Sequence, residues 1–149
     1  MVLRYLNYCC IVWGANYFGR LEHLLKLQNR MIRIIIDLKK KITPTFFKSL
    51  NILNVTEINV LQTSLFMYKL YNRLLPQNFS SFLCLNNDLH QHYTRSHKNF
   101  HLVSVKTNRK FSLKFRDTVI WNKIPEIYQF AISISSFKKL LKDCLINNY

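Results

Sequence analysis

The acidic side chains of this sequence are too few and too widely spaced to build a catalytic metal site. Two-metal phosphoryl transfer needs carboxylates grouped around ions about 3.5–4 Å apart. The seven acids stand singly, at Glu22, Asp37, Glu57, Asp88, Asp117, Glu126 and Asp143. The two glycines, Gly14 and Gly19, cannot supply the backbone nest of a phosphate-binding loop. We therefore expect no catalytic residue and no enzymatic activity in this chain alone.

The histidines offer an alternative chemistry. Four of them lie close together in the sequence, at His90, His92, His97 and His101. His97 and His101 have the i, i+4 spacing that metal sites on helices use, and Cys84 completes a possible ligand set. The surrounding stretch lacks helical periodicity, however, and its spacing matches no standard zinc template. We expect solvated loop histidines, no metal and no cofactor.

The basic residues carry the main signal. Lys and Arg total 22 against 7 for Asp and Glu, which gives a formal net charge of +15. Such an excess of positive charge favours nucleic acid as the partner, bound through its phosphates. A coding sequence biased toward Lys, Asn, Ile, Phe and Tyr would produce the same surplus without a binding role. The candidate phosphate contacts form three groups: Lys26, Arg30 and Arg33; Lys39, Lys40 and Lys41; and Arg109, Lys110, Lys114 and Arg116.

Helices must position most of these residues. Apolar residues recur at steps of three and four over residues 3–18, with Gly19 expected to end that helix, and again from Arg20 onward. On the second helix, Lys26, Arg30 and Arg33 should project as one basic ridge. Further helices are predicted from Pro44, with Thr43 as its N-cap, from Thr56 to a stop at Pro76, from Pro125, and from Ser135 or Ser136 as cap. The predicted fold class is mainly α, a multi-helix bundle.

One short β-hairpin is predicted near residues 100–116. Phe111, Leu113 and Phe115 alternate with basic and polar residues, which is the period of a half-buried strand. Leu102, Val103 and Val105 would form its partner. This hairpin would present Arg109, Lys110, Lys114 and Arg116 on its outer face.

The chain is expected to be a single domain over residues 1–149. Residues 1–83 form its helical part, 84–116 the loop and hairpin, and 117–149 the C-terminal helices. No window approaches the roughly 20 apolar residues that span a bilayer, and the first residues imitate a signal peptide only loosely. The four cysteines show no disulfide-scaffold spacing. We expect an intracellular protein of the nucleus or cytoplasm, with no membrane partner.

Several short motifs occur in a fixed order along the chain. They are Leu6-Asn7-Tyr8, Val12-Trp13-Gly14, Leu27-Gln28-Asn29-Arg30, Tyr93-Thr94-Arg95, Trp121-Asn122-Lys123-Ile124-Pro125 and Phe137-Lys138-Lys139. In this order they resemble the C-terminal, thumb and post-polymerase region of the jockey-type non-long-terminal-repeat retrotransposon reverse transcriptases. The resemblance implies a fragment, truncated or decayed, of an RNA-directed DNA polymerase. The Tyr-x-Asp-Asp centre of that enzyme is absent here.

The resemblance also implies roles for individual residues. It adds Gln28, Tyr93 and Arg95 to the candidate nucleic-acid contacts, and it marks Trp13, Trp121, Asn122 and Pro125 as structural motif residues. For Trp121 and Asn122, packing and capping before the last helices compete with a contact to template and primer. Asp117 stands where similar proteins have glycine, which puts the local turn in question.

Two functions remain open at this point. The first is a non-catalytic segment that binds template and primer or element RNA through its basic surface. The second is a protein-interaction or scaffold module, a degenerate transposon remnant whose apolar, aromatic surface once packed against the upstream polymerase domain. The expected partners are RNA or DNA and that polymerase domain.

Overall fold

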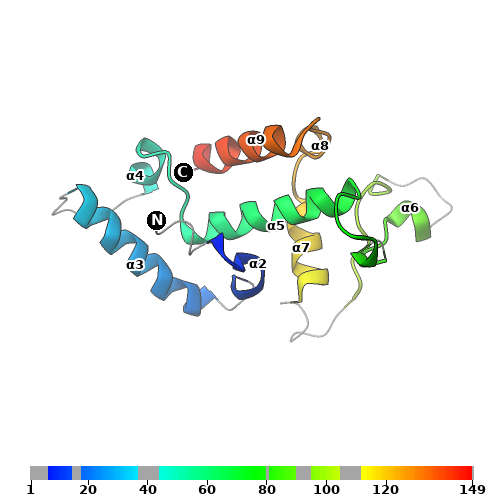
Figure 1. The fold of residues 1–149 in the computed structure, drawn as a ribbon, viewed down its shortest axis with the longest axis horizontal. Helices are drawn as coiled ribbons and strands as arrows, with labels where there is room; N and C mark the ends of the chain where they lie inside the picture. The colour runs from blue at the N-terminus through cyan, green and yellow to red at the C-terminus, as the bar shows by residue number, and fades with distance from the viewer. Residues whose placement is uncertain are drawn as a thin grey trace. The chain divides into compact units, whose positions relative to one another are not determined.

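The computed structural model describes residues 7–14, 18–36, 44–79, 81–89, 95–104 and 112–148. These residues are mainly helical, as predicted (Figure 1). The elements are α2 (Cys10–Trp13), α3 (Phe18–Ile36), α4 (Pro44–Ser49), α5 (Val55–Tyr71), the 3-10 helix η1 (Gln77–Phe79), α6 (Asn86–Leu89), α7 (Leu113–Asn122), α8 (Glu126–Gln129) and α9 (Ile134–Asn147). None of the helices within these ranges has the length and apolar continuity that crossing a membrane requires.

The chain divides into two compact units. The first comprises Met1–Gln62 and Lys138–Tyr149, and the second comprises Thr63–Phe137. These boundaries differ from the sequence-based subdivisions at residues 83 and 116.

In the first unit, a reciprocal hydrogen-bond pair starts α5. The Asn54 side chain accepts the Glu57 backbone N–H at 2.9 Å, and the Asn54 backbone N–H donates to Glu57 Oε2 at 3.2 Å. This is a capping box, which satisfies two backbone donors that a helix start leaves open. Burial raises the pKa of Glu57 to about 7, while the hydrogen bond from Asn54 acts in the opposite direction.

Gly14 is the C-cap of α2 and lies against the Asn59 side chain. Gly14 donates its backbone N–H to the Cys10 carbonyl, and the Asn59 side chain, which donates to the same carbonyl at 2.6 Å, occupies the space that a Cβ on Gly14 would need. The prediction that Gly19 ends this helix was therefore wrong, because Gly19 lies inside α3. Residues 1–6 and 15–17 of the predicted first helix lie outside the described residues.

Helices α4 and α5 end in the same way. After α4, Asn51 adopts φ 54°, and Ile52 donates to the Phe47 carbonyl at 3.0 Å. After α5, Arg73 adopts φ 55°, and Leu74 donates to the Lys69 carbonyl at 2.8 Å. Both are Schellman motifs, in which glycine is the usual left-handed residue. The left-handed conformation costs a non-glycine residue about 1–2 kcal/mol, so Arg73 is held there at a cost.

An aromatic cluster forms the core of the second unit. Trp121 and Phe137 are completely buried. The ring of Phe137 stacks on Tyr68 at 4.7 Å between centroids, and Trp121 lies 5.7 Å from Tyr71 and 6.4 Å from Phe100. Contacts of this kind contribute about 0.5–1.5 kcal/mol each beyond the area they bury. The cluster joins α5, α7 and the start of α9 within this unit.

The Trp-Asn motif lies in this core. Asn122 donates to the Phe100 carbonyl at 2.9 Å and accepts the Phe100 N–H at 3.2 Å, so it holds Phe100 at the end of α7. Gln129 donates to the carbonyls of Trp121 and Ile124 at 3.0 and 2.9 Å, which closes the end of α7. Pro125 directly precedes α8, as its ring geometry favours.

The predicted β-hairpin is not seen. Residues 113–116 belong to α7, and residues 101–104 form no strand. Residues 105–111, which hold the predicted turn, lie outside the described residues. The alternating stretch was too short to exclude a helix. The buried residues of α7, Asp117, Thr118 and Trp121, instead have the spacing of one helical face. An isolated antiparallel bridge joins Leu85 to Phe100 instead.

Candidate nucleic-acid interface

The basic ridge of α3 is exposed. Lys26, Arg30 and Arg33 occupy one face of the helix, because steps of four and three residues return to the same side. Lys26 Nζ lies 2.9 Å from Glu22 Oε1, and this partner lowers the pKa of the Glu22 carboxyl through the hydrogen bond and the ammonium charge. Neither Arg30 nor Arg33 forms an ion pair within the described part of the chain. Both arginines are exposed, so a phosphate can reach them from solvent.

Gln28 lies on the opposite side of α3 and has a structural role. Its side chain is 7% exposed, donates to the Leu53 carbonyl at 2.9 Å and accepts the Val55 N–H at 3.0 Å. The amide thereby satisfies backbone groups at the start of α5, far along the sequence. The amide is buried and is already bonded at both its nitrogen and its oxygen, so the structure gives Gln28 a packing role.

Lys114 lies beside an aromatic ring. It is exposed on the first turn of α7, and its Nζ lies 5.0 Å from the centroid of the Phe82 ring. The two residues line a cavity of about 570 Å³ together with Phe115, His101 and Ser112. A cation over an aromatic face beside an apolar cavity can bind a phosphate and a base together.

Arg116 and Asp117 form a weak, partly buried pair. The distance from Arg116 Nη1 to Asp117 Oδ1 is 3.9 Å, which is too long for a hydrogen bond. Asp117 is 1% exposed, and neither carboxylate oxygen has a hydrogen-bond partner among the described residues. Burial raises the pKa of Asp117 to about 6, and the nearby Arg116 charge partly opposes that shift. Arg116 is thus turned toward the interior more than the predicted hairpin would place it.

The remaining predicted contacts are distributed as follows. Arg95 is exposed in the turn before Ser96. The other predicted contacts, Lys39, Lys40, Lys41, Tyr93, Arg109 and Lys110, lie outside the described residues. Trp13, the first of the structural motif residues, donates its indole N–H to the Tyr8 carbonyl at 2.7 Å.

The histidine stretch forms no metal site in the part of the chain that is described. No group of three potential ligands occurs there. His97 lies in a turn rather than in a helix, and His101 follows outside any regular element, so their i, i+4 spacing does not place them on one helical face. His101 Nδ1 lies 3.3 Å from Asn86 Oδ1. His90 and His92 lie outside the described residues.

Two features of this surface were missed by sequence reasoning. Phe82 approaches Lys114 only through the fold, since 32 positions (114 − 82) separate them in the sequence. Arg73 lines a second cavity and has a left-handed backbone conformation. Glycine is the usual residue at such a position, and no local sequence motif predicts that an arginine will adopt it. Aromatic richness was the one available signal for Phe82.

Comparisons with protein-family models, with curated proteins and with solved structures find no match to this chain.

Proposed function

We propose that this chain is a non-catalytic nucleic-acid-binding module that holds its ligand mainly through the phosphate backbone. Its motifs resemble the C-terminal region of jockey-type retrotransposon reverse transcriptases, and we assign it as a fragment of such a protein. In that role it contacts template and primer or element RNA, in the nucleus or cytoplasm, beside an upstream polymerase domain that supplies the chemistry.

The observation that carries the proposal is the pair of exposed arginines on α3. Arg30 and Arg33 are exposed, lie one turn apart and have no acidic partner among the described residues. Guanidinium groups bind phosphate oxygens in a bidentate manner. The net charge of +15 adds long-range attraction for a polyanion.

The surroundings of the acidic residues support a role without catalysis. Glu57 belongs to a capping box, Asp117 is buried away from solvent, and Glu22 and Glu126 face lysines. Glu57, Glu22 and Glu126 are engaged by these neighbours, whereas the Asp117 carboxylate has no hydrogen-bond partner among the described residues. No two of the seven acids are adjacent in the sequence, and two-metal chemistry needs grouped carboxylates.

The test is a salt titration of binding by fluorescence anisotropy. The triple variant Lys26→Glu, Arg30→Glu, Arg33→Glu should lower affinity and flatten the plot of log K against log salt by about two to three units, at about 0.7–0.9 per lost phosphate contact. The matched control changes Lys138, Lys139 and Lys142 of α9 to Glu, which alters the net charge equally. If the two variants have equal slopes, binding depends on net charge and the α3 ridge is not the binding site. If the wild type binds no nucleic acid at low salt, the proposed function is wrong.

A second function is favoured by the neighbouring face of α3. Leu27, Met31 and Ile34 are exposed at steps of four and three, with Ile34 at 71%. An apolar stripe beside a basic ridge fits a protein partner with an apolar surface and an acidic rim. The variant Leu27→Gln, Met31→Gln, Ile34→Gln would separate the two functions. It should leave nucleic-acid affinity unchanged if the module binds only nucleic acid, and it should abolish any salt-insensitive association if a protein interface is present.

A further inference from the structure

The second unit holds an open cavity beside Arg73. Its volume is about 400 Å³, near the lower end of the range of about 300–1,000 Å³ found for small-molecule sites. The wall is formed by the end of α5, by η1, by α6 and by Phe100, with Tyr71, Gln77, Phe79 and Asp88 among the lining residues. Such a space is large enough for one planar base with its sugar.

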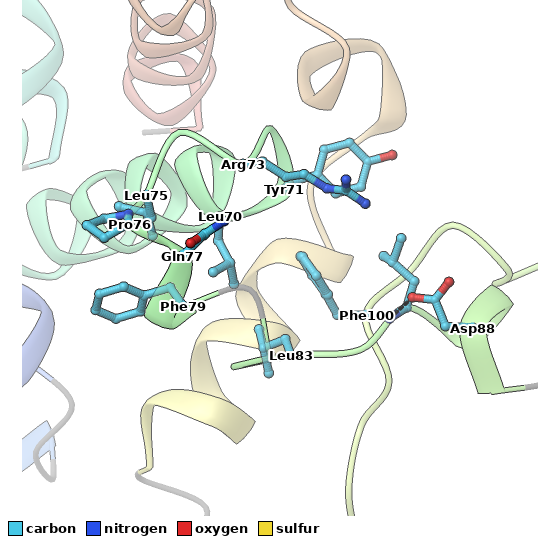
Figure 2. Close-up of a pocket in the computed structure, with 11 residues that line it drawn as sticks. Leu70, Tyr71, Arg73, Leu75, Pro76, Gln77, Phe79, Leu83, Asp88 and Phe100 are labelled. Carbon is cyan, nitrogen blue, oxygen red and sulfur yellow. Dashed lines mark hydrogen bonds between the residues drawn. The ribbon is translucent and has the colours of Figure 1, made fainter.

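The charged residues Arg73 and Asp88 and the aromatic residue Phe79 all line the cavity. In Figure 2 the Arg73 side chain extends to the side on which Asp88 lies, whereas Pro76 and Phe79 lie on the other. Arg73 forms no ion pair within the described residues, so its charge is open to a ligand. Asp88 Oδ2 accepts the Leu85 N–H at 3.3 Å, which leaves Oδ1 for another donor.

Phe79 provides a surface for stacking. Its ring is 36% exposed and meets the rings of Phe66 and Phe82 edge to face, with centroids 6.1 Å away in each case. These edge contacts fix the ring without stacking on it. An unpaired base can therefore lie against one face of Phe79, which is the usual way that proteins bind single strands.

The backbone of Arg73 supports a role for its side chain. Arg73 adopts φ 55° at the end of α5, a position where glycine is free of strain. Strained backbone of this kind occurs preferentially at binding sites. Glycine would adopt this conformation without that cost, whereas only an arginine brings a guanidinium to the cavity.

The two charges together select the ligand. Arg73 and Asp88 line the same cavity. The carboxylate disfavours a free dianionic phosphate there, whereas a phosphodiester carries a single charge and lies next to a sugar. A carboxylate also accepts a hydrogen bond from a ribose 2′-hydroxyl, the group that distinguishes RNA from DNA. On these grounds we propose that the cavity beside Arg73 holds one unpaired ribonucleotide of single-stranded RNA, with its phosphate on Arg73, its 2′-hydroxyl on Asp88 and its base against Phe79.

This inference rests on the proposed nucleic-acid binding and makes it specific for unpaired RNA. The wild type should bind a short single-stranded RNA about tenfold more tightly than the DNA strand of the same sequence, as one hydrogen bond to a charged group allows. The perfectly paired RNA duplex should bind without that advantage. Anisotropy with labelled strands measures all three affinities.

Three variants test the assigned contacts. Arg73→Gly should lower affinity for the RNA about tenfold or more and reduce the salt slope by about 0.7, with no loss of thermal stability. Asp88→Ala should remove the preference for RNA, because DNA binding rises as a repulsive charge is lost. Phe79→Leu should weaken both single strands and leave duplex binding unchanged.

Two controls keep these outcomes distinct. Asn51→Gly makes the same glycine substitution at the other left-handed helix end, in the first unit, and should not change RNA binding. Lys123→Ala removes one exposed cation from the second unit away from the cavity and should leave the RNA preference unchanged.

The possible results separate the two proposals. If RNA and DNA bind equally and Arg73→Gly behaves like Lys123→Ala, the cavity assignment is overturned while general nucleic-acid binding stands. If neither nucleic acid binds, both proposals fail. If adenosine 5′-monophosphate binds in an Arg73-dependent manner while the RNA does not, the site takes a free nucleotide, and the assignment to RNA is overturned.

Discussion

The buried carboxyl group of Asp117 should destabilise the protein whenever it is ionised. Its folded-state pKa is about 6 against an ordinary value of 3.8, because burial disfavours the charged form. For an acid whose pKa is raised on folding, stability is fully present below the unfolded value and is lost as pH rises through the folded value. The loss therefore falls between about pH 3.8 and pH 6.

Asp117→Asn isolates this effect, since asparagine has nearly the same shape and stays neutral. A shift of roughly two units at about 1.4 kcal/mol per unit gives an advantage of about 3 kcal/mol for the variant above pH 6, and none near pH 4. At about 2–4 °C per kcal/mol, the unfolding midpoint should rise by roughly 6–12 °C.

The assay is urea or thermal denaturation of both proteins at several pH values, followed by circular dichroism. The contribution of Glu57 cancels in the difference, because both proteins contain it. The reasoning is refuted if the wild type and the Asp117→Asn variant differ by the same amount at pH 4 and pH 8, since the buried charge would then have no energetic consequence.

Three further predictions concern local contacts. Gln28→Ala should lower the free energy of unfolding by about 2–4 kcal/mol, because two buried backbone groups lose their partner; denaturant titration measures this, and an unchanged unfolding midpoint would contradict it. Asn122→Ala should cost about 1–3 kcal/mol through loss of its two bonds to Phe100, and hydrogen exchange of the Phe100 amide should accelerate; continued protection of that amide would count against the role. Glu57→Gln should keep the capping box. Ionisation of Glu57 should lower the free energy of unfolding of the wild type between about pH 4.5 and pH 7, and the variant should lack this loss. Identical pH profiles of stability for the variant and the wild type would exclude a buried ionisation at this position.

The arrangement of α3 has a consequence for partner choice. Its inward face carries Leu21, Gln28 and Ile32, and its outer surface divides into the basic ridge and the apolar stripe of Leu27, Met31 and Ile34. Two copies of this chain should not associate through the basic ridge, because like charges would be brought together. A polyanion or an acidic protein is complementary in charge to the same surface.

Sequence reasoning succeeded where a pattern repeats over several helical turns. Apolar residues at steps of three and four predicted helix α3 and the exposure of Arg30 and Arg33 on it. Helix α4 begins at Pro44, as predicted. It failed for residues 113–116, where four alternating positions fit a strand and a helix equally well. The start of α9 also differs slightly, because Ser133 Oγ rather than a later serine accepts the Ser136 N–H.

The sequence by itself determined the helical class, the cationic surplus and the separation of the carboxylates, since periodicity, charge and spacing are properties of neighbouring residues. Only the tertiary structure decided the role of individual side chains. Gln28 became a backbone partner of Leu53 and Val55, Lys114 came to lie on Phe82, and Arg73 came to line a cavity. The physical reason is that burial and hydrogen bonding join groups that are distant along the chain, and local patterns carry no information about which distant groups will meet.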